Sequence, residues 1–168
     1  MPVRRHSASL SRTPRGRPLV LLRPHAPKPT PSGYPLILPL HGFSDEPYSH
    51  NSPCAVVSHL HALWTCVVAA PHCHVSEPYW SGDELRETIM MLLDDGGIDR
   101  RRIYVTGFSM GGAAATNFLA KHSDLLAAAV IVSAPLYVDS NPPPSLASLP
   151  PVCCARLTSK RRLLPFQW

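Results

Sequence analysis

Short apolar runs alternate with longer amphipathic stretches through the middle of the chain. Four runs lack the alternation of a half-exposed strand and are typical of strands buried on both faces: residues 34–40, 64–70, 102–106 and 125–133. Between them the pattern predicts three helices: residues 54–63, the stretch from Ser81 to the Gly96–Gly97 pair, and residues 110–122. Strands that alternate with helices at this spacing predict an α/β fold with a mostly parallel, doubly wound sheet.

The pattern changes at both ends of the chain. Residues 1–32 are rich in Pro and Arg, and we predict a basic arm that is disordered at its start. Residues 33–139 form the predicted α/β domain, and residues 140–168 a Pro-rich and then basic tail, in which residues 152–157 are one more candidate strand. The sheet would then lack its last strands, and its exposed edge predicts self-association.

Charge follows the same division. The chain is 45% hydrophobic and 16% charged, as a globular domain is, and its net charge is +5. Residues 1–30 hold seven Lys or Arg and no acid, whereas all eleven acids lie between residues 31 and 151, with only five bases. A basic nucleic-acid-binding face on the folded body is therefore not expected.

The N-terminal composition bears on location. The first residues are rich in Arg and Ser and lack acids, as organelle transit peptides do, but their apolar run at residues 19–22 is too short for a signal peptide. No stretch approaches 18 apolar residues, so stable membrane insertion is not expected. Five cysteines without a Cys-x-x-Cys pair indicate free thiols in a reducing compartment. We predict a cytoplasmic location, with organelle targeting as the alternative.

A serine between two glycines follows the third apolar run. Gly107-Phe108-Ser109-Met110-Gly111 matches Gly-x-Ser-x-Gly, which places a nucleophile on a sharp turn between a strand and a helix. Larger side chains at Gly107 and Gly111 would collide with neighbouring elements. The motif therefore predicts Ser109 as a nucleophile and the Met110 N–H, at the helix start, as an oxyanion donor. A glycine-rich turn with an incidental serine is the alternative.

A second loop supports this interpretation. Leu38-Pro39-Leu40-His41-Gly42-Phe43 is a strand that runs into a His-Gly turn. In hydrolases with such an elbow this loop donates the other oxyanion N–H, here that of Phe43. His41 and Gly42 are then candidate substrate-binding residues. Tyr79 and Trp80 are candidates to line an acyl pocket, with simple packing as the alternative.

The stretch from Tyr34 to about Asp139 resembles the α/β-hydrolase fold. Within it the chain is similar to the esterase, acyl-thioesterase and predicted-peptidase group, which includes polyhydroxybutyrate-depolymerase-like and feruloyl-esterase-like enzymes. The likeness lies in YPLILPLHGFSD, in CVVAAPHC followed by YWSGDEL, and in GIDRRRIYVTGFSMGGAAATNFLAKHSDLLAAAVIVSA. The resemblance implies hydrolysis of a small acyl ester or thioester through an acyl-enzyme, without a metal or organic cofactor.

The partners of a catalytic serine are harder to place. A serine needs a histidine base and an orienting carboxylate, which in this family follow the nucleophile. His122 is the histidine after Ser109, but thirteen helical residues separate them, about 20 Å. Asp139 is a candidate acid because it follows the next strand, although the resembled group places its acid one strand later. The sequence beyond Val152-Cys153-Cys154-Ala155-Arg156 departs from the family, which suggests a truncated, alternatively spliced or frame-shifted gene model.

Three alternatives stay open. An upstream histidine, His41, His72 or His74, would act as a substitute base. The chain would instead be an inactive hydrolase remnant that binds an acyl ligand or a partner protein. A zinc site would use His59, His61 and the His72-Cys73-His74 run, with Cys54 and Cys66 nearby, but the spacing fits no standard zinc pattern, and no metal is predicted.

Overall fold

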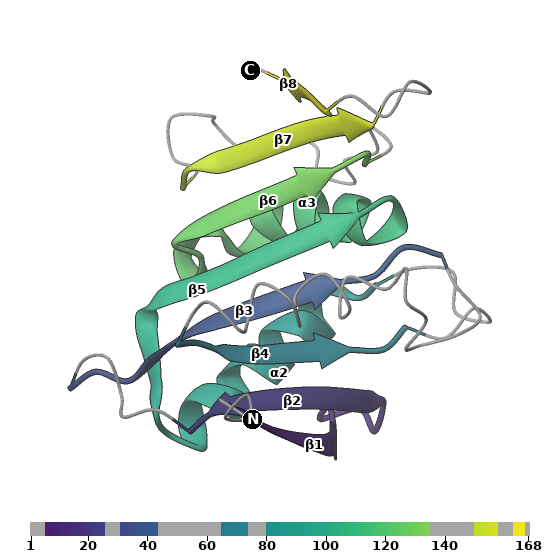
Figure 1. Ribbon diagram of the computed structural model, residues 1–168. Helices are drawn as coiled ribbons and strands as arrows, with labels where there is room; N and C mark the ends of the chain where they lie inside the picture. The colour runs from purple at the N-terminus through teal and green to yellow at the C-terminus, as the bar shows by residue number, and fades with distance from the viewer. Residues whose placement is uncertain are drawn as a thin grey trace, which may run out of the picture.

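Eight strands form one sheet in the part of the chain that the structure describes (Figure 1). The computed structural model describes residues 6–25, 31–43, 65–73, 80–134, 150–157 and 163–166. The strand order is β1-β2-β4-β3-β5-β6-β7-β8. The strands are β1 (His6–Arg12), β2 (Pro18–Pro24), β3 (Tyr34–Leu40), β4 (Val67–Pro71), β5 (Ile98–Phe108), β6 (Ala128–Val132), β7 (Val152–Leu157) and β8 (Leu163–Phe166).

The central strands β4, β3, β5, β6 and β7 are parallel. This confirms the predicted α/β class and its mostly parallel sheet. Strands β3 and β7 match their predicted ranges, whereas β5 is longer than predicted. Strand β6 is shorter, because Ser123–Leu125 form the short 3-10 helix η1 before it. Parallel strands bring their carboxyl ends to one edge of the sheet, and the loops after β3, β4 and β5 therefore meet there.

Two α-helices, α2 (Gly82–Asp94) and α3 (Met110–His122), pack against the sheet and against each other. They lie on the same side of the sheet (Figure 1). Helix α2 begins at Ser81, whose Oγ accepts the Glu84 N–H at 3.4 Å as an N-cap. Both helices match the prediction, and the helix predicted over residues 54–63 lies outside the described residues. In the ranges described here, neither helix is long and apolar enough to cross a membrane.

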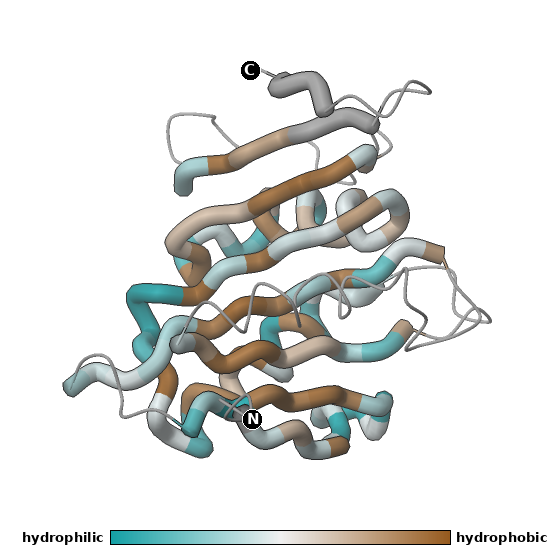
Figure 2. The backbone as a smooth tube through the Cα atoms, in the orientation of Figure 1, coloured by the Kyte–Doolittle hydropathy of each residue, from teal (hydrophilic) through white to brown (hydrophobic). Residues whose placement is uncertain are grey.

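The hydrophobic core lies between the two helices and the sheet. Figure 2 shows hydrophobic residues along the inner strands, where β3 to β6 run side by side. The core residues contributed by the helices are Leu85, Ile89, Leu92, Ala114, Ala115, Phe118 and Leu119. They contact buried strand residues such as Leu38 and Val105. The i, i+3, i+4 spacing of Leu85, Ile89 and Leu92 gives α2 one apolar stripe, which is the stripe that it buries.

The N-terminal segment differs from its prediction. Residues 6–24, which we expected in a basic arm, form the antiparallel hairpin β1–β2, and β2 pairs with β4. Two facts explain the difference. Leu19 and Leu21 alternate on the core face and are buried. Three of the four arginines of the segment, Arg15, Arg17 and Arg23, pair with acids of α2 and of the turn after it. The arm prediction is therefore wrong for these residues, and the sheet begins before residue 33.

The C-terminal segment also adds to the sheet. Strand β8 pairs antiparallel with β7, although residues 158–168 show no periodicity. The sheet therefore runs from β1 at one edge to β8 at the other (Figure 1). The self-association expected from an exposed edge stays a prediction.

Candidate active site

Ser109 lies on a strained turn between β5 and α3. Its backbone has φ 52° and ψ −116°, a conformation that L-residues rarely adopt and that type II′ turns reserve for glycine. The turn is held on both sides, since the Ser109 N–H donates to the Val132 carbonyl at 3.0 Å and its own carbonyl accepts the Ala113 N–H at 3.0 Å. The elbow predicted from the motif is thus present, and it places Ser109 at the carboxyl edge of the sheet.

The two motif glycines allow the backbone around Ser109 to pack closely. A Cβ on Gly107 would lie 2.1 Å from the Gly111 carbonyl oxygen, and a Cβ on Gly111 would lie 2.1 Å from the Leu40 carbonyl oxygen. No side chain fits at either distance, and the obstructing atoms are backbone. Gly111 therefore brings the start of α3 against the end of β3.

We expect Ser109→Gly to stabilise the protein. Strain at a non-glycine residue of this kind costs about 1–3 kcal/mol, which the substitution would relieve. The greater conformational entropy of glycine in the unfolded chain offsets about 0.5–1 kcal/mol of that stabilisation. The net increase in the free energy of unfolding should be about 1 kcal/mol, measured by urea denaturation. Ser109→Ala is the matched control, because alanine keeps the Cβ and should leave stability near that of the wild type. A Ser109→Gly variant no more stable than Ser109→Ala would contradict strain at this residue.

The loop after β3 lies against the elbow. A Cβ added to Gly42 would be 3.2 Å from Cδ1 of Phe108 and 3.4 Å from Cβ of Ser109. Phe43, the next residue, has a side chain that is 69% exposed. The structure therefore brings Gly42 against Ser109, which lies 67 residues further along the sequence.

His41 is buried behind this loop, with 3% of its surface exposed. Its Nε2 accepts the Cys73 N–H at 3.0 Å, so the proton of the neutral ring lies on Nδ1, which donates to the Gly42 carbonyl at 2.7 Å. Burial lowers the pKa of His41 and favours this neutral form. The Nε2 lone pair is directed at Cys73 rather than at Ser109, so this geometry does not support His41 as the substitute base.

Two aromatic side chains pack on His41. The ring of His72 stacks on it with centroids 5.0 Å apart and planes 20° apart, and the Trp80 ring meets it edge-on, also at 5.0 Å. Trp80, predicted to line an acyl pocket, is half-buried against the hydrophobic core. The contacts of Trp80 in the structure are therefore those of simple packing, which was the alternative to a role in an acyl pocket. Tyr79, His74 and Asp139 lie outside the described residues.

His122 lies at the far end of α3 from Ser109, as the sequence indicated. Its ring packs on Phe118 with centroids 5.0 Å apart, and its Nε2 is 3.8 Å from a carboxylate oxygen of Asp83 on α2. The twelve residues between His122 and Ser109 are helical, which places the two about 20 Å apart. His122 is a helix-packing residue in this structure.

The candidate zinc ligands are not assembled in the described ranges, where no three His, Cys, Asp or Glu side chains cluster in a way that would hold a metal ion. His59, His61 and Cys54 lie outside those ranges. Cys66, Cys73, Cys153 and Cys154 form no disulfide. Burial raises the pKa of Cys66 to about 11, so its thiol stays protonated near neutral pH.

Solved structures show what the architecture is. MGS-M1, an alpha/beta hydrolase from a Medee basin deep-sea metagenome library, superposes with a TM-score of 0.65 at 16% identity, over 89% of this chain and 67% of that one. The S-formylglutathione hydrolase FrmB from Staphylococcus aureus gives 0.63 at 19% identity, over 79% of this chain and 59% of that one. This chain has the α/β-hydrolase fold. A thermostable esterase gives 0.59 at 24% identity, over 77% of this chain and 41% of that one.

The likeness is structural and partial. The chain spans 41%, 46% and 45% of three esterase structures that it matches. No family model matches the sequence, and no curated protein matches it. The superpositions establish the α/β-hydrolase fold. The sequence identities are all under 25%, so the activity rests on the geometry of the site itself.

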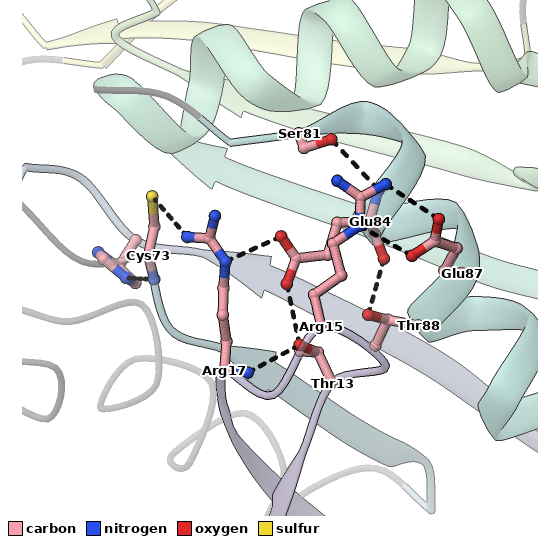
Figure 3. A network of polar contacts seen from close by, with 9 residues as sticks. Thr13, Arg15, Arg17, Cys73, Ser81, Glu84, Glu87 and Thr88 are labelled. Carbon is pink, nitrogen blue, oxygen red and sulfur yellow. Dashed lines mark hydrogen bonds and ion pairs between the residues drawn. The ribbon is translucent and has the colours of Figure 1, made fainter. Parts of the chain in front are cut away.

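One polar cluster of this α/β-hydrolase fold was missed in the sequence. In Figure 3, Thr13 and Arg17 from the β1–β2 turn point at Glu84 in the first turn of α2. Thr13 donates to Glu84 Oε1 at 2.9 Å, and Arg17 Nε lies 2.8 Å from Oε2. Thr13 and Glu84 are both buried. The available signal was the charge pattern, a base-rich segment without acids and a helix that opens with acids, which indicates pairing between the two.

Proposed function

We propose that this chain is a serine hydrolase that cleaves carboxylic ester or thioester bonds. The observation that carries the proposal is the strained backbone of Ser109 at the carboxyl edge of the sheet. Such strain persists only where the surrounding structure enforces it, and it is common at active sites. Here two glycines and two backbone hydrogen bonds enforce it. The structural neighbours support the reaction class, since esterases and serine hydrolases are among them.

In the proposed reaction Ser109 Oγ attacks the carbonyl carbon of the substrate and loses its proton to a base. The carbonyl oxygen becomes an oxyanion, which the N–H groups of Phe43 and Met110 would stabilise. Collapse of the intermediate expels the alcohol or thiol, which takes up the proton, and leaves an acyl-enzyme. Water then releases the carboxylic acid. Each step uses only the chain, the substrate and water, so we propose no metal or organic cofactor.

The base and the acid are the parts of the proposal that rest on sequence position. His72 lies just after β4, at the edge of the sheet that holds Ser109, and His74 follows it two residues later in the sequence, so they are the histidines to replace in a search for the base. Asp139, beyond β6, keeps its assignment as candidate orienting acid. A true base should lower the rate by several orders of magnitude when replaced.

The proposed substrate is a small ester or thioester with an apolar acyl group. Phe43 is 69% exposed and Phe108 is 38% exposed. Phe108 precedes Ser109 in the sequence, and Phe43 follows Gly42, the residue that lies against Ser109. Exposed aromatic rings beside a nucleophile are a surface that an apolar acyl chain would cover.

An inactive binding protein is the second candidate. Two observations favour it: both ring nitrogens of His41 are engaged elsewhere, and His122 lies at the far end of α3. A chain with this arrangement would bind an acyl ligand without turning it over.

A fluorophosphonate probe separates the two candidates, because it forms a covalent bond with an activated serine. We expect the wild-type chain to be labelled at Ser109, shown by mass spectrometry of peptides, and Ser109→Ala to remain unlabelled. Ser123→Ala, which changes a serine at the other end of α3, is the matched control and should be labelled like the wild type. A folded wild-type chain that takes up no probe would support the inactive candidate. Ester turnover alone is insufficient, because free cysteines and histidines also cleave activated esters.

A further inference from the structure

A chain of polar contacts connects the β1–β2 turn to the loop beside Ser109. Arg17 Nε pairs with Glu84 Oε2 at 2.8 Å, and Arg17 Nη1 donates to the Cys73 sulfur at 3.6 Å. The Cys73 N–H donates to His41 Nε2 at 3.0 Å, and His41 Nδ1 donates to the Gly42 carbonyl at 2.7 Å. Figure 3 shows Arg17 between the Glu84 carboxylate and the Cys73 sulfur.

The links of this chain are shielded from water. The side chain of Glu84 is 6% exposed and that of Arg17 is 20% exposed, while Cys73 and His41 are buried. Hydrogen bonds and ion pairs are electrostatically stronger in such surroundings than in water. A second pair from the same turn, Arg15 with Glu87, is different, because its side chains are 46% and 41% exposed. The two ion pairs join the same hairpin to the same helix. Of the two arginines, Arg17 in the buried pair also contacts Cys73.

The contact between His41 and the Gly42 carbonyl affects the proposed oxyanion site through the geometry of one peptide group. The Gly42 carbonyl and the Phe43 N–H belong to the same planar, trans peptide, so they point in opposite directions. When His41 holds the Gly42 carbonyl, it also fixes the direction of the Phe43 N–H. The tautomer of His41 that makes this bond is in turn selected by the Cys73 N–H.

We propose that Arg17 and Cys73 are positioning residues, which act through His41 to hold the Phe43 N–H in the orientation of an oxyanion donor. The inference rests on the proposed function. It gives the N-terminal hairpin a role in the active site, although no residue of β1 or β2 belongs to the Gly-x-Ser-x-Gly or His-Gly motifs. Glu84 acts one step further away, by holding the Arg17 guanidinium in place.

Two substitutions test the chain of contacts, and one serves as a control. Arg17→Lys keeps the positive charge beside Glu84 but has a single ammonium group, which does not reproduce the fork that reaches both Glu84 and Cys73. Cys73→Ala removes the sulfur and leaves Arg17 paired with Glu84, so it remains informative if Arg17→Lys fails to fold. Arg15→Lys is the matched control, because it makes the same change in the exposed pair of the same turn.

The first readout is the rate of fluorophosphonate labelling, since the phosphoryl oxygen of the probe occupies the oxyanion site. Loss of an oxyanion donor costs about 10²–10³ in rate, so a misdirected one should cost roughly tenfold. We expect that loss in Arg17→Lys and in Cys73→Ala, and labelling within about twofold of the wild type in Arg15→Lys. Equal rates in Arg17→Lys and Arg15→Lys would overturn the inference.

The second readout is nuclear magnetic resonance of the His41 ring nitrogens, which reports the tautomer and does not depend on activity. The Arg17→Lys and Cys73→Ala variants should change these signals at a temperature where both are fully folded, and Arg15→Lys should not. A purely structural role would lower the unfolding temperature and leave the signals unchanged, which would count against the proposal. If the wild type takes up no probe, the proposed function fails, and the His41 signals alone decide whether the hairpin controls the loop.

Discussion

Replacing Gly111 with alanine is expected to lower the free energy of unfolding by about 3 kcal/mol and to remove labelling of Ser109. The new Cβ would lie 2.1 Å from the Leu40 carbonyl oxygen and 2.6 Å from that of His41. Neither atom is able to move as a flexible side chain does, so either β3 or the start of α3 must shift. Alanine is the better helix former by about 1 kcal/mol, but the steric cost is larger. Urea denaturation followed by circular dichroism measures the loss.

The control for this substitution is Gly82→Ala. Gly82 is also the first glycine of a helix, yet nothing lies within 4 Å of the Cβ that it would gain. Its free energy of unfolding should equal that of the wild type or exceed it by up to about 1 kcal/mol, since only helix propensity changes. If Gly111→Ala were as stable as Gly82→Ala, the close approach of α3 to β3 would be wrong.

Truncating Phe118 to alanine is expected to cost about 3–5 kcal/mol of stability, the usual loss for a fully buried aromatic ring. Phe118 is 1% exposed, and it belongs to the core cluster between α3 and the sheet. Its ring also packs on His122. The loss of packing acts on the helix whose first residue, Met110, is the proposed oxyanion donor, so labelling of Ser109 should fall as well. Urea denaturation and probe labelling measure the two effects.

Lys121→Ala is the matched control on the same helix, because Lys121 is exposed. Its free energy of unfolding should lie within about 0.5 kcal/mol of the wild type. A loss below about 1 kcal/mol for Phe118→Ala would show that the cavity collapses at little cost, and that α3 is not anchored by this residue.

The parts of the fold that the sequence predicted well have strong local signals. The Gly-x-Ser-x-Gly motif lies between an apolar run and an Ala-rich stretch, and the structure has β5, the elbow and α3 in that order. Helix α2 begins at the Ser81 cap and ends before Gly96, as predicted. These signals come from backbone conformation and from hydrophobic periodicity, both of which depend on a few neighbouring residues in the sequence.

The N-terminal hairpin was predicted poorly because its reasons are long-range. Pro, Arg and Ser in residues 6–24 resemble a solvated arm when they are considered locally. The segment forms a pair of strands because β2 pairs with the edge of β4, and because Arg17 and Arg15 form ion pairs with acids about 70 residues later in the sequence. Partners at such separation leave no periodic trace in the sequence.

For the candidate active site, the sequence by itself determined that Ser109 lies on an elbow, because only small neighbours and a strand-to-helix transition permit that turn. It also determined that His122 is out of reach, because the rise of one helix fixes that distance. Tertiary structure alone decided what surrounds the serine. Parallel strands bring Gly42 against Ser109, and burial holds His41 in one neutral tautomer between Cys73 and the Gly42 carbonyl. Those contacts join segments that only the pairing of β3 with β4 and β5 brings together.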